Sequence, residues 1–358
     1  MTAVIIGWTL SIAVALVVGW LVPAVAIKGL LPSLEASGRR VTNYRGRRIP
    51  TGLGLVWLVW AVGVALASTA LGYWGILRGT PISLIQGFPL LLVVGSLAFG
   101  LVDDVFGGGD AKGFRGHLRA MADGRLTTGG LKLLGIGVLA LVVSAGSLQI
   151  SLDARDPWLS LVRLICGALV IALSANFVNL TDLRPGRAIK AYGFLAITGV
   201  VLYVIGISPD LIRGSVLSAE SLLGLADAKI AAVCLLILLL GPVAAVWRYD
   251  LGERAMLGDA GANAMGALAG FFLVVTTPLW LLVVLAFVLL ALNLASEKVS
   301  FSKVIERVAF LKWIDGLGRV SVGSFGEVSE QDADDGERTG GSASADDEAW
   351  KDGGISTR

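Results

Sequence analysis

The stretch LLLVVGSLAFGLVDD, residues 90–104, is apolar along most of its length and ends in two adjacent carboxylates, Asp103 and Asp104. The apolar run that contains it begins near Leu84 and ends at Val102, and a helix needs roughly 20 apolar residues to cross a bilayer. Charged groups beside a membrane span are costly and are usually kept for ion binding, proton transfer or contact with a substrate. The pair therefore marks a candidate functional site at the end of a membrane span.

The rest of the chain is apolar to a similar degree. Its 358 residues are 55% hydrophobic, and their mean hydropathy is +0.80. Frequent glycine and the lack of alternation between polar and apolar residues favour helices over a β-barrel. We therefore expect an all-α protein, a polytopic transmembrane helical bundle of about 9–10 spans.

Nine apolar runs of spanning length can be marked, at residues 3–27, 52–73, 84–102, 131–147, 159–178, 188–207, 230–247, 262–276 and 279–294. The first run has no Lys or Arg before it, so we interpret it as a span and not as a cleaved leader. We expect residues 1–298 to form the transmembrane domain, residues 299–320 to form a basic amphipathic cytoplasmic helix, and residues 321–358 to form a disordered acidic tail.

Positive charge is distributed unevenly between the loops that join these runs. The loops after odd-numbered runs carry most of the Lys and Arg, and the first of them holds Arg39, Arg40, Arg45, Arg47 and Arg48. Because cytoplasmic loops carry such an excess, we expect the N-terminus outside and the odd loops in the cytoplasm, in a multi-pass plasma-membrane protein. Whether any one of these arginines does more than set the orientation stays open. The net charge of +2 gives no global basic field, so we expect no nucleic-acid partner.

Five unusual polar stretches fall in the loops after odd-numbered runs, at residues 47–54, 103–132, 176–182, 256–263 and 297–319. On the orientation above, all five face the cytoplasm. A transporter would place polar groups near the middle of the membrane on interrupted helices, and it often shows an internal repeat that is not visible here. This distribution favours a cytoplasmic active site at the membrane surface.

The polar side chains in these stretches are of the types that bind magnesium and phosphate. The carboxylates Asp103, Asp104, Asp182 and Asp259, together with Asn176 and Asn179, offer the hard oxygen ligands that Mg²⁺ selects. Around them lie cations that suit phosphate groups, namely Arg47, Arg48, Lys112, Arg115, Lys132, Arg184, Arg187 and Lys190. A metal and cations beside carboxylates are typical of phosphoryl transfer.

Simpler roles stay open for some of these residues. Asp182 could serve only as the C-cap of its span together with Asn179. Asp259 could serve only as the N-cap of the eighth span, although capping and metal binding are compatible. His117, the only histidine, lies in a polar loop, where a loop contact is favoured over a role as catalytic base.

Four of the polar stretches, taken in order, resemble the motifs of the polyprenyl-phosphate N-acetylhexosamine-1-phosphate transferase superfamily, which includes phospho-MurNAc-pentapeptide translocase and the GlcNAc-1-phosphate transferases. They are PTGLG at residues 50–54, the Asp-Asp motif at 100–104, NFVNLTD at 176–182 and MLGDAG at 256–261. The resemblance extends over roughly residues 47–263. It implies transfer of a sugar-1-phosphate, of the N-acetylhexosamine type, from a UDP-sugar to undecaprenyl or another polyprenyl phosphate. UMP would be released, and a cell-envelope glycan would be initiated.

The resemblance also implies roles for particular residues. Asp259 and Asp104 would hold Mg²⁺, and Asp103 and Asp104 would handle the lipid phosphate and the diphosphate, with Asp103 as base or positioning group. The implied substrate contacts are Arg48, Thr51, Lys132, Asn176, Asn179, Asp182, Arg187 and Asn263. The expected partners are the membrane, a polyprenyl phosphate and a UDP-sugar, and the resemblance suggests a homodimer.

The chain departs from the family pattern at two places. After the NFVNLTD motif it reads LRPGR, residues 183–187, where the translocase has a Gly-x-Asp-Gly segment that helps to hold the uridine. Residues 296–307 stand where the family has a His-rich loop that is associated with sugar recognition. An alternative function is therefore that of a catalytically silent relative that binds the lipid carrier as an envelope assembly factor.

Overall fold

The computed structural model describes residues 2–73, 85–107, 113–148, 156–207 and 219–318. Within these ranges nine helical segments are long and apolar enough to cross a membrane, which indicates a multi-pass membrane protein. They are Ile5–Ala36, Leu53–Tyr73, Phe88–Phe106, Thr128–Ser147, Pro157–Thr181, Arg187–Gly206, Asp227–Leu251, Gly258–Thr276 and Leu279–Ser296. Each overlaps one of the nine predicted runs, so the prediction of a polytopic helical protein is confirmed. The predicted acidic tail, residues 321–358, lies outside the described residues.

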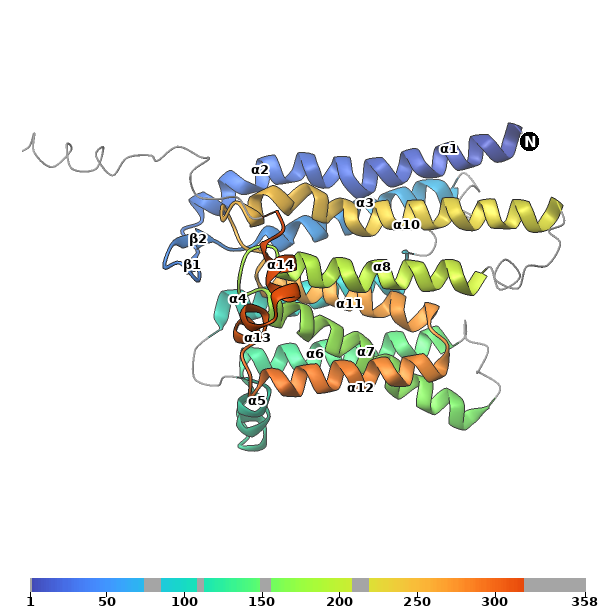
Figure 1. Cartoon of the computed structure of the whole chain (residues 1–358). Coiled ribbons are helices and arrows are strands. Elements are labelled where there is room, and N and C mark those ends of the chain that lie inside the picture. Colours follow the sequence, from blue (N-terminus) through green and yellow to red (C-terminus); the bar gives the residue numbers. More distant parts are fainter. Residues whose placement is uncertain (1, 74–84, 108–112, 149–155, 208–218, 319–358) are drawn as a thin grey trace, which may run out of the picture. The chain divides into compact units, whose positions relative to one another are not determined.

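The elements follow one another in the order shown in Figure 1. They are α1 (Thr2–Leu16), the π-helical turn η1 (Val17–Leu21), α2 (Val22–Ala36), β1 (Arg40–Thr42), β2 (Arg48–Pro50), the 3₁₀ turn η2 (Leu53–Leu55), α3 (Val56–Tyr73), α4 (Phe88–Phe106), α5 (Gly113–Ala122), α6 (Thr128–Ser147), α7 (Pro157–Thr181), α8 (Arg187–Ile207), α10 (Ala219–Leu251), α11 (Gly258–Thr276), α12 (Leu279–Ser296), α13 (Phe301–Arg307) and α14 (Ala309–Gly316). The hairpin, α5, α13 and α14 lie at one end of the long helices, and the N-terminus lies at the other (Figure 1).

Helix α11 is the centre of the bundle. Of its most apolar 18-residue window, 83% is buried, against 22% for the neighbouring α12. Small residues allow this burial: a Cβ atom on Gly266 would come within 2.3 Å of the Ser174 carbonyl of α7, and one on Gly270 within 2.8 Å of Ile171 Cα. Helices in membranes associate closely at such small residues. The packing fixes α11 against α7 and α4, and with it the polar residues at its N-terminus.

The first polar loop contains the described part's only sheet, a short hairpin that the all-α prediction did not include. β1 and β2 pair in antiparallel register, with Val41 opposite Ile49. Glu253, in the loop between α10 and α11, has a backbone φ of 54° and holds the hairpin by accepting hydrogen bonds from Asn43 Nδ2 at 2.8 Å and Tyr44 Oη at 3.3 Å. The hairpin therefore brings the segment that follows it against the start of α11.

The segment after α12 differs from the single amphipathic helix that we expected over residues 299–320. It forms two short helices, α13 and α14, which are separated at Val308 by an extended backbone with φ −94° and ψ 111°. The break turns the chain, so that both helices contact the span ends beside them.

Candidate functional site

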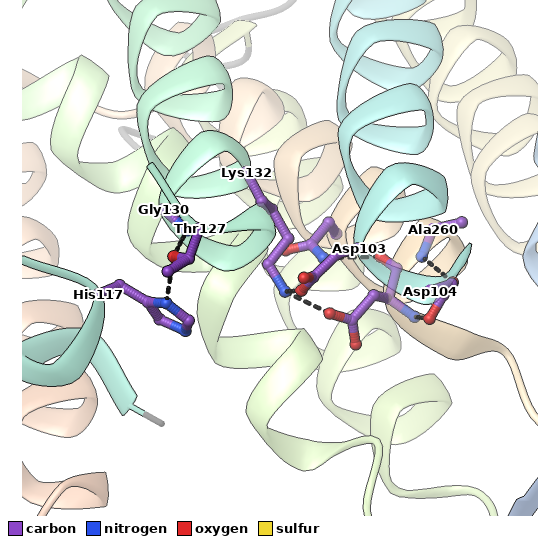
Figure 2. A network of polar contacts seen from close by, with 9 residues as sticks. Asp103, Asp104, His117, Thr127, Gly130, Lys132 and Ala260 are labelled. Carbon is purple, nitrogen blue, oxygen red and sulfur yellow. Dashed lines mark hydrogen bonds and ion pairs between the residues drawn. The ribbon is translucent and has the colours of Figure 1, made fainter. Parts of the chain in front are cut away.

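Three charged side chains from three helices meet at the end of the bundle that carries the hairpin; Figure 2 shows two of them, Asp103 and Lys132. Asp103 lies in the last turn of α4, Lys132 in the second turn of α6, and Asp259 in the first turn of α11. Lys132 Nζ lies 2.6 Å from Asp103 Oδ2 and is also paired with Asp259. The side chains of Lys132, Asp103 and Asp259 are 10%, 17% and 32% exposed. We call these three residues the Lys132 cluster; its most accessible member is Asp259.

Asp104 caps the N-terminus of α11 from a different helix. Its Oδ1 accepts a hydrogen bond from the Asp259 amide, and its Oδ2 accepts one from the Ala260 amide, both at 3.0 Å (Figure 2). The first amides of a helix have no partner within the helix, and a negative charge there is favoured by the helix dipole. Asp104 therefore fixes the position of Asp259. Asp259 itself lies in the first turn of α11 and not at the N-cap position, which is occupied by Leu257.

Glycines let the backbones at this site approach closely. A Cβ atom on Gly54 would lie 2.3 Å from Gly261 Cα, and one on Gly100 would lie 2.5 Å from the Asp259 carbonyl oxygen. Gly258 has a φ of 74°, which favours glycine, and a Cβ there would meet Thr51 Oγ1 and Asp104 Oδ2. The PTGLG, Asp-Asp and MLGDAG motifs thus converge on the start of α11.

Asp182 joins the NFVNLTD motif to the same place. It is the C-cap residue of α7, where its amide donates to the Asn179 carbonyl, and its Oδ2 accepts a hydrogen bond from the Gly258 amide at 3.1 Å. Burial of the carboxyl raises its pKa well above the ordinary value, and the charges of Asp250 and Asp259 raise the pKa further, although the hydrogen bond from Gly258 opposes the shift. Asp182 therefore both caps its helix and ties it to α11.

The side chain of Asn179 contains a buried oxygen, Oδ1, without a hydrogen-bond partner among the described residues. A buried polar atom without a partner is unfavourable in the absence of a ligand or water. Asn179 therefore keeps an acceptor free beside the Asp182 motif, which fits its expected role as a substrate contact.

The remaining expected substrate residues are not all at the cluster. Asn176 Nδ2 donates to Asn293 Oδ1 of α12 at 2.6 Å. Asn263 is 1% exposed and donates to the Asp259 carbonyl within α11. Arg187 is 5% exposed and forms a bidentate ion pair with Asp315 of α14, with Nε–Oδ1 at 2.8 Å and Nη2–Oδ2 at 2.9 Å. Arg48 is exposed on β2. In this structure the side chain of Asn263 bonds within α11, and that of Arg187 joins α8 to α14.

Several residues that support the cluster were not predicted as such. The Thr128 side chain hydrogen-bonds Asp103, and Thr127 caps α6 by accepting from the Gly130 amide at 3.0 Å. His117, which we expected in a loop, lies in α5, and its Nδ1 is 2.8 Å from Thr127 Oγ1 (Figure 2). Asp250 is 3% exposed and accepts from the Gly186 amide at 2.6 Å, so it holds the loop that follows Asp182. The Thr-Thr-Gly-Gly sequence before the fourth span is a recognisable N-cap signal.

The carboxylates of the site offer a partial donor set for Mg²⁺. Among the described residues, no three His, Cys, Asp or Glu side chains converge into a metal site. Asp103 and Asp259 nevertheless share one cation, the Lys132 ammonium, and Mg²⁺ is often held by one or two carboxylates together with substrate phosphates. These two carboxylates fit such an ion. Asp104, which we expected as a ligand, has an oxygen on each of two backbone amides.

Comparisons with protein-family models and with curated proteins found no match to this chain.

Proposed function

We propose that this protein transfers a sugar-1-phosphate from a UDP-sugar to a polyprenyl phosphate, releases UMP, and so initiates a cell-envelope glycan. The observation that carries the proposal is the meeting of Asp103, Lys132 and Asp259 at one end of a bundle of apolar helices. A lipid phosphate is confined to the bilayer surface, and a soluble nucleotide must reach it there. A site at the end of the spans serves both substrates.

The bond changes follow from the substrates. An oxygen of the lipid phosphate forms a bond to the sugar-side phosphorus of the UDP-sugar, the bond from that phosphorus to the bridging oxygen breaks, and UMP leaves with that oxygen. Positioning and charge compensation supply most of the catalysis in such transfers. The Lys132 ammonium would offset charge on the phosphates, and Asp103 would position the lipid phosphate or accept its proton. Asn179 would offer its unpartnered oxygen to the donor.

Mg²⁺ would be held by Asp259 and Asp103, and Asp104 would position Asp259 through the amides that it caps. When bound, the ion would supply charge neutralisation for the diphosphate. The Lys132 ammonium, which pairs with both carboxylates, would offset charge on the phosphates. We propose that the site lies on the cytoplasmic face of the plasma membrane, because the loops at this end of the bundle are basic.

The test measures UMP release by purified protein with undecaprenyl phosphate and Mg²⁺, with UDP-GlcNAc, UDP-GalNAc and UDP-MurNAc-pentapeptide offered separately. Asp259→Asn should lower the rate by on the order of a hundredfold or more, since it removes a carboxylate charge that would hold Mg²⁺. The matched control is Asp156→Asn, the same chemical change at the N-cap of α7, where Asn caps as well as Asp. Equal rates for the two variants would refute the proposed role of Asp259.

A second candidate is a catalytically silent binder of the lipid carrier. Two expected substrate contacts, Arg187 and Asn263, bond to other parts of the protein instead. This observation favours the binder over the transferase. Folded protein that binds labelled polyprenyl phosphate and releases no UMP with any donor would support the binder. UMP release with one donor would exclude it.

A further inference from the structure

Residues 297–318, which we call the strap, run along the ends of several spans. Phe301 packs edge-on against Phe177 of α7, with ring centroids 6.1 Å apart. Lys190 of α8 donates to the Ile314 and Asp315 carbonyls at 2.9 and 2.8 Å. A Cβ atom on Gly318 would lie 3.0 Å from the Trp247 ring of α10. The strap therefore contacts three spans beyond α12, from which it continues.

These contacts place the strap at the ends of α7 and α8. Phe177 lies four residues before the end of α7, and Lys190 lies three residues after the start of α8. At 1.5 Å per residue these positions are about 6 and 4.5 Å from the helix ends. Where a span leaves the hydrocarbon core, its end lies in the headgroup region of the bilayer. The strap consequently lies beside the bundle at the interface.

The strap has more basic than acidic residues. Its acidic residues are Glu297, Glu306 and Asp315. Glu306 pairs with Arg184 at 2.6 Å, and Asp315 forms the bidentate pair with Arg187, which also donates to Ser302 at 2.7 Å. The exposed basic residues of the strap are Lys298, Lys303, Arg307 and Lys312, and its exposed acidic residues are Glu297 and the paired Glu306. The outer surface therefore carries an excess of positive charge.

The same outer surface is apolar between the charges. Phe310 and Trp313 are 64% and 61% exposed and stack on each other, with ring centroids 6.1 Å apart. Val304, Val308 and Leu317 are also exposed. Aromatic and aliphatic residues beside Lys and Arg are typical of helices that lie in the bilayer interface, where the rings enter the headgroup boundary and the cations meet anionic lipids.

We propose that the outer face of the strap binds anionic phospholipids of the bilayer that the protein spans. The positive surface provides charge complementarity, the stacked rings provide apolar area, and the contacts with α7, α8 and α10 hold the face at the depth of the headgroups. The inference goes beyond the proposed transferase function and does not depend on it. It concerns a different surface from the Lys132 cluster.

The test places a nitroxide on Val308, which is 43% exposed and leaves both rings intact. Val308→Cys is made in a chain with Cys166→Ala and Cys234→Ala, since these are the free cysteines of the described residues. The matched control label is at Val41 of β1, which is 40% exposed. Accessibility to oxygen and to a water-soluble nickel chelate is measured in nanodiscs of phosphatidylcholine alone and in nanodiscs that also contain phosphatidylglycerol.

The label at Val308 should become more accessible to oxygen and less accessible to nickel when phosphatidylglycerol is present, and the Val41 label should change little. In the triple variant Lys303→Glu, Arg307→Glu, Lys312→Glu the shift should disappear, because each basic residue near an anionic surface favours binding by about fivefold. Nickel accessibility at Val308 equal to that at Val41 in both lipids would overturn the proposal. Insertion that is the same with and without phosphatidylglycerol would also overturn it. The lipid comparison needs no charge variant, so a misfolded variant would not affect it.

Discussion

Two groups of charges at the same end of the bundle show opposite arrangements. The Arg187–Asp315 pair is closed, because its side chains are 4% and 9% exposed and the guanidinium meets the carboxylate through two parallel hydrogen bonds. The Lys132 cluster is open, because one cation serves two carboxylates and the Asp259 side chain is 32% exposed.

The difference separates a structural role from a chemical one. A closed pair is buried and its two charges balance each other, so its contribution is to join α8 to α14. An open cluster has an excess of negative charge that a second cation or a proton donor can satisfy. Sequence motifs do not reveal this distinction, since both groups consist of ordinary Arg, Lys and Asp residues in the same set of loops.

Breaking the closed pair should give the largest effect on stability. Asp315→Ala leaves the Arg187 guanidinium buried without its partner, and the loss of one member of a buried pair costs about 3–5 kcal/mol. SDS titration of the purified protein would measure the free energy of unfolding. The double variant Arg187→Met, Asp315→Leu should recover most of the loss, because it removes both charges.

The control for this experiment is Glu306→Ala on the same strap. Its ion pair with Arg184 has side-chain exposures of 24% and 51%, and exposed pairs contribute about 0–1 kcal/mol. If Asp315→Ala were no more harmful than Glu306→Ala, the Arg187 pair would not be the structural contact described above, and its assignment to substrate would regain support.

Separating the helices beneath the open cluster should have the next largest effect. In Gly100→Ala the new methyl group would lie 2.5 Å from the Asp259 carbonyl oxygen, and such overpacking costs about 1–3 kcal/mol. UMP release should fall as well, because Asp259 moves away from Asp103. The control, Gly137→Ala in α6, has no atom within 4 Å of the new methyl and should leave both stability and UMP release close to wild type. Equal responses of the two variants would contradict the close approach of α4 and α11.

The sequence predicted the spans well and their polar ends less well. The second run was predicted at residues 52–73, and the structure has the helical segment Leu53–Tyr73 there. The two agree because the ends of this segment coincide with the ends of its apolar sequence. The eighth was expected from residue 262, yet α11 begins at Gly258. A run that is marked by hydropathy stops at a charged residue, whereas a helix can extend past it. Here Asp104 of α4 accepts hydrogen bonds from two of the first amides of α11, so the helix begins before its apolar run. The three-residue strands of the hairpin were too short to give a periodic signal.

The candidate site was predicted in its acidic members and not in its pairings. Asp103, Asp104, Asp182 and Asp259 were identified from motifs and do meet at the start of α11. The closed pair was missed because Arg187 and Asp315 are 128 residues apart in sequence, and no local pattern links them. Asp315 itself lies outside every motif. Such pairings depend on how the helices pack, which a single sequence does not specify.

Replacing the trans cap of α11 should have a smaller effect than either change above. Asp104→Asn keeps one acceptor oxygen and presents an NH₂ group to the other amide, so we expect a loss of about 1–2 kcal/mol in the free energy of unfolding. Mg²⁺ should still raise the melting temperature of this variant. Unchanged stability with a lost response to Mg²⁺ would instead make Asp104 a metal ligand, as the family resemblance implies.

The smallest expected effect tests the open cluster directly. In Lys132→Gln the carboxylates of Asp103 and Asp259 lose the cation that they share, and their mutual repulsion should make the fold more responsive to Mg²⁺. An ion that binds the folded state at ten times its Kd stabilises it by about 1.4 kcal/mol. The wild type should respond less, because Lys132 competes for the same oxygens. The exposed Lys298→Gln serves as control and should respond as the wild type does. The added response should vanish when Asp259→Asn is combined with Lys132→Gln, since one carboxylate is then neutral. If it persisted, the ion would bind elsewhere, and the shared oxygens of Asp103 and Asp259 would no longer explain how an open cluster differs from a closed pair.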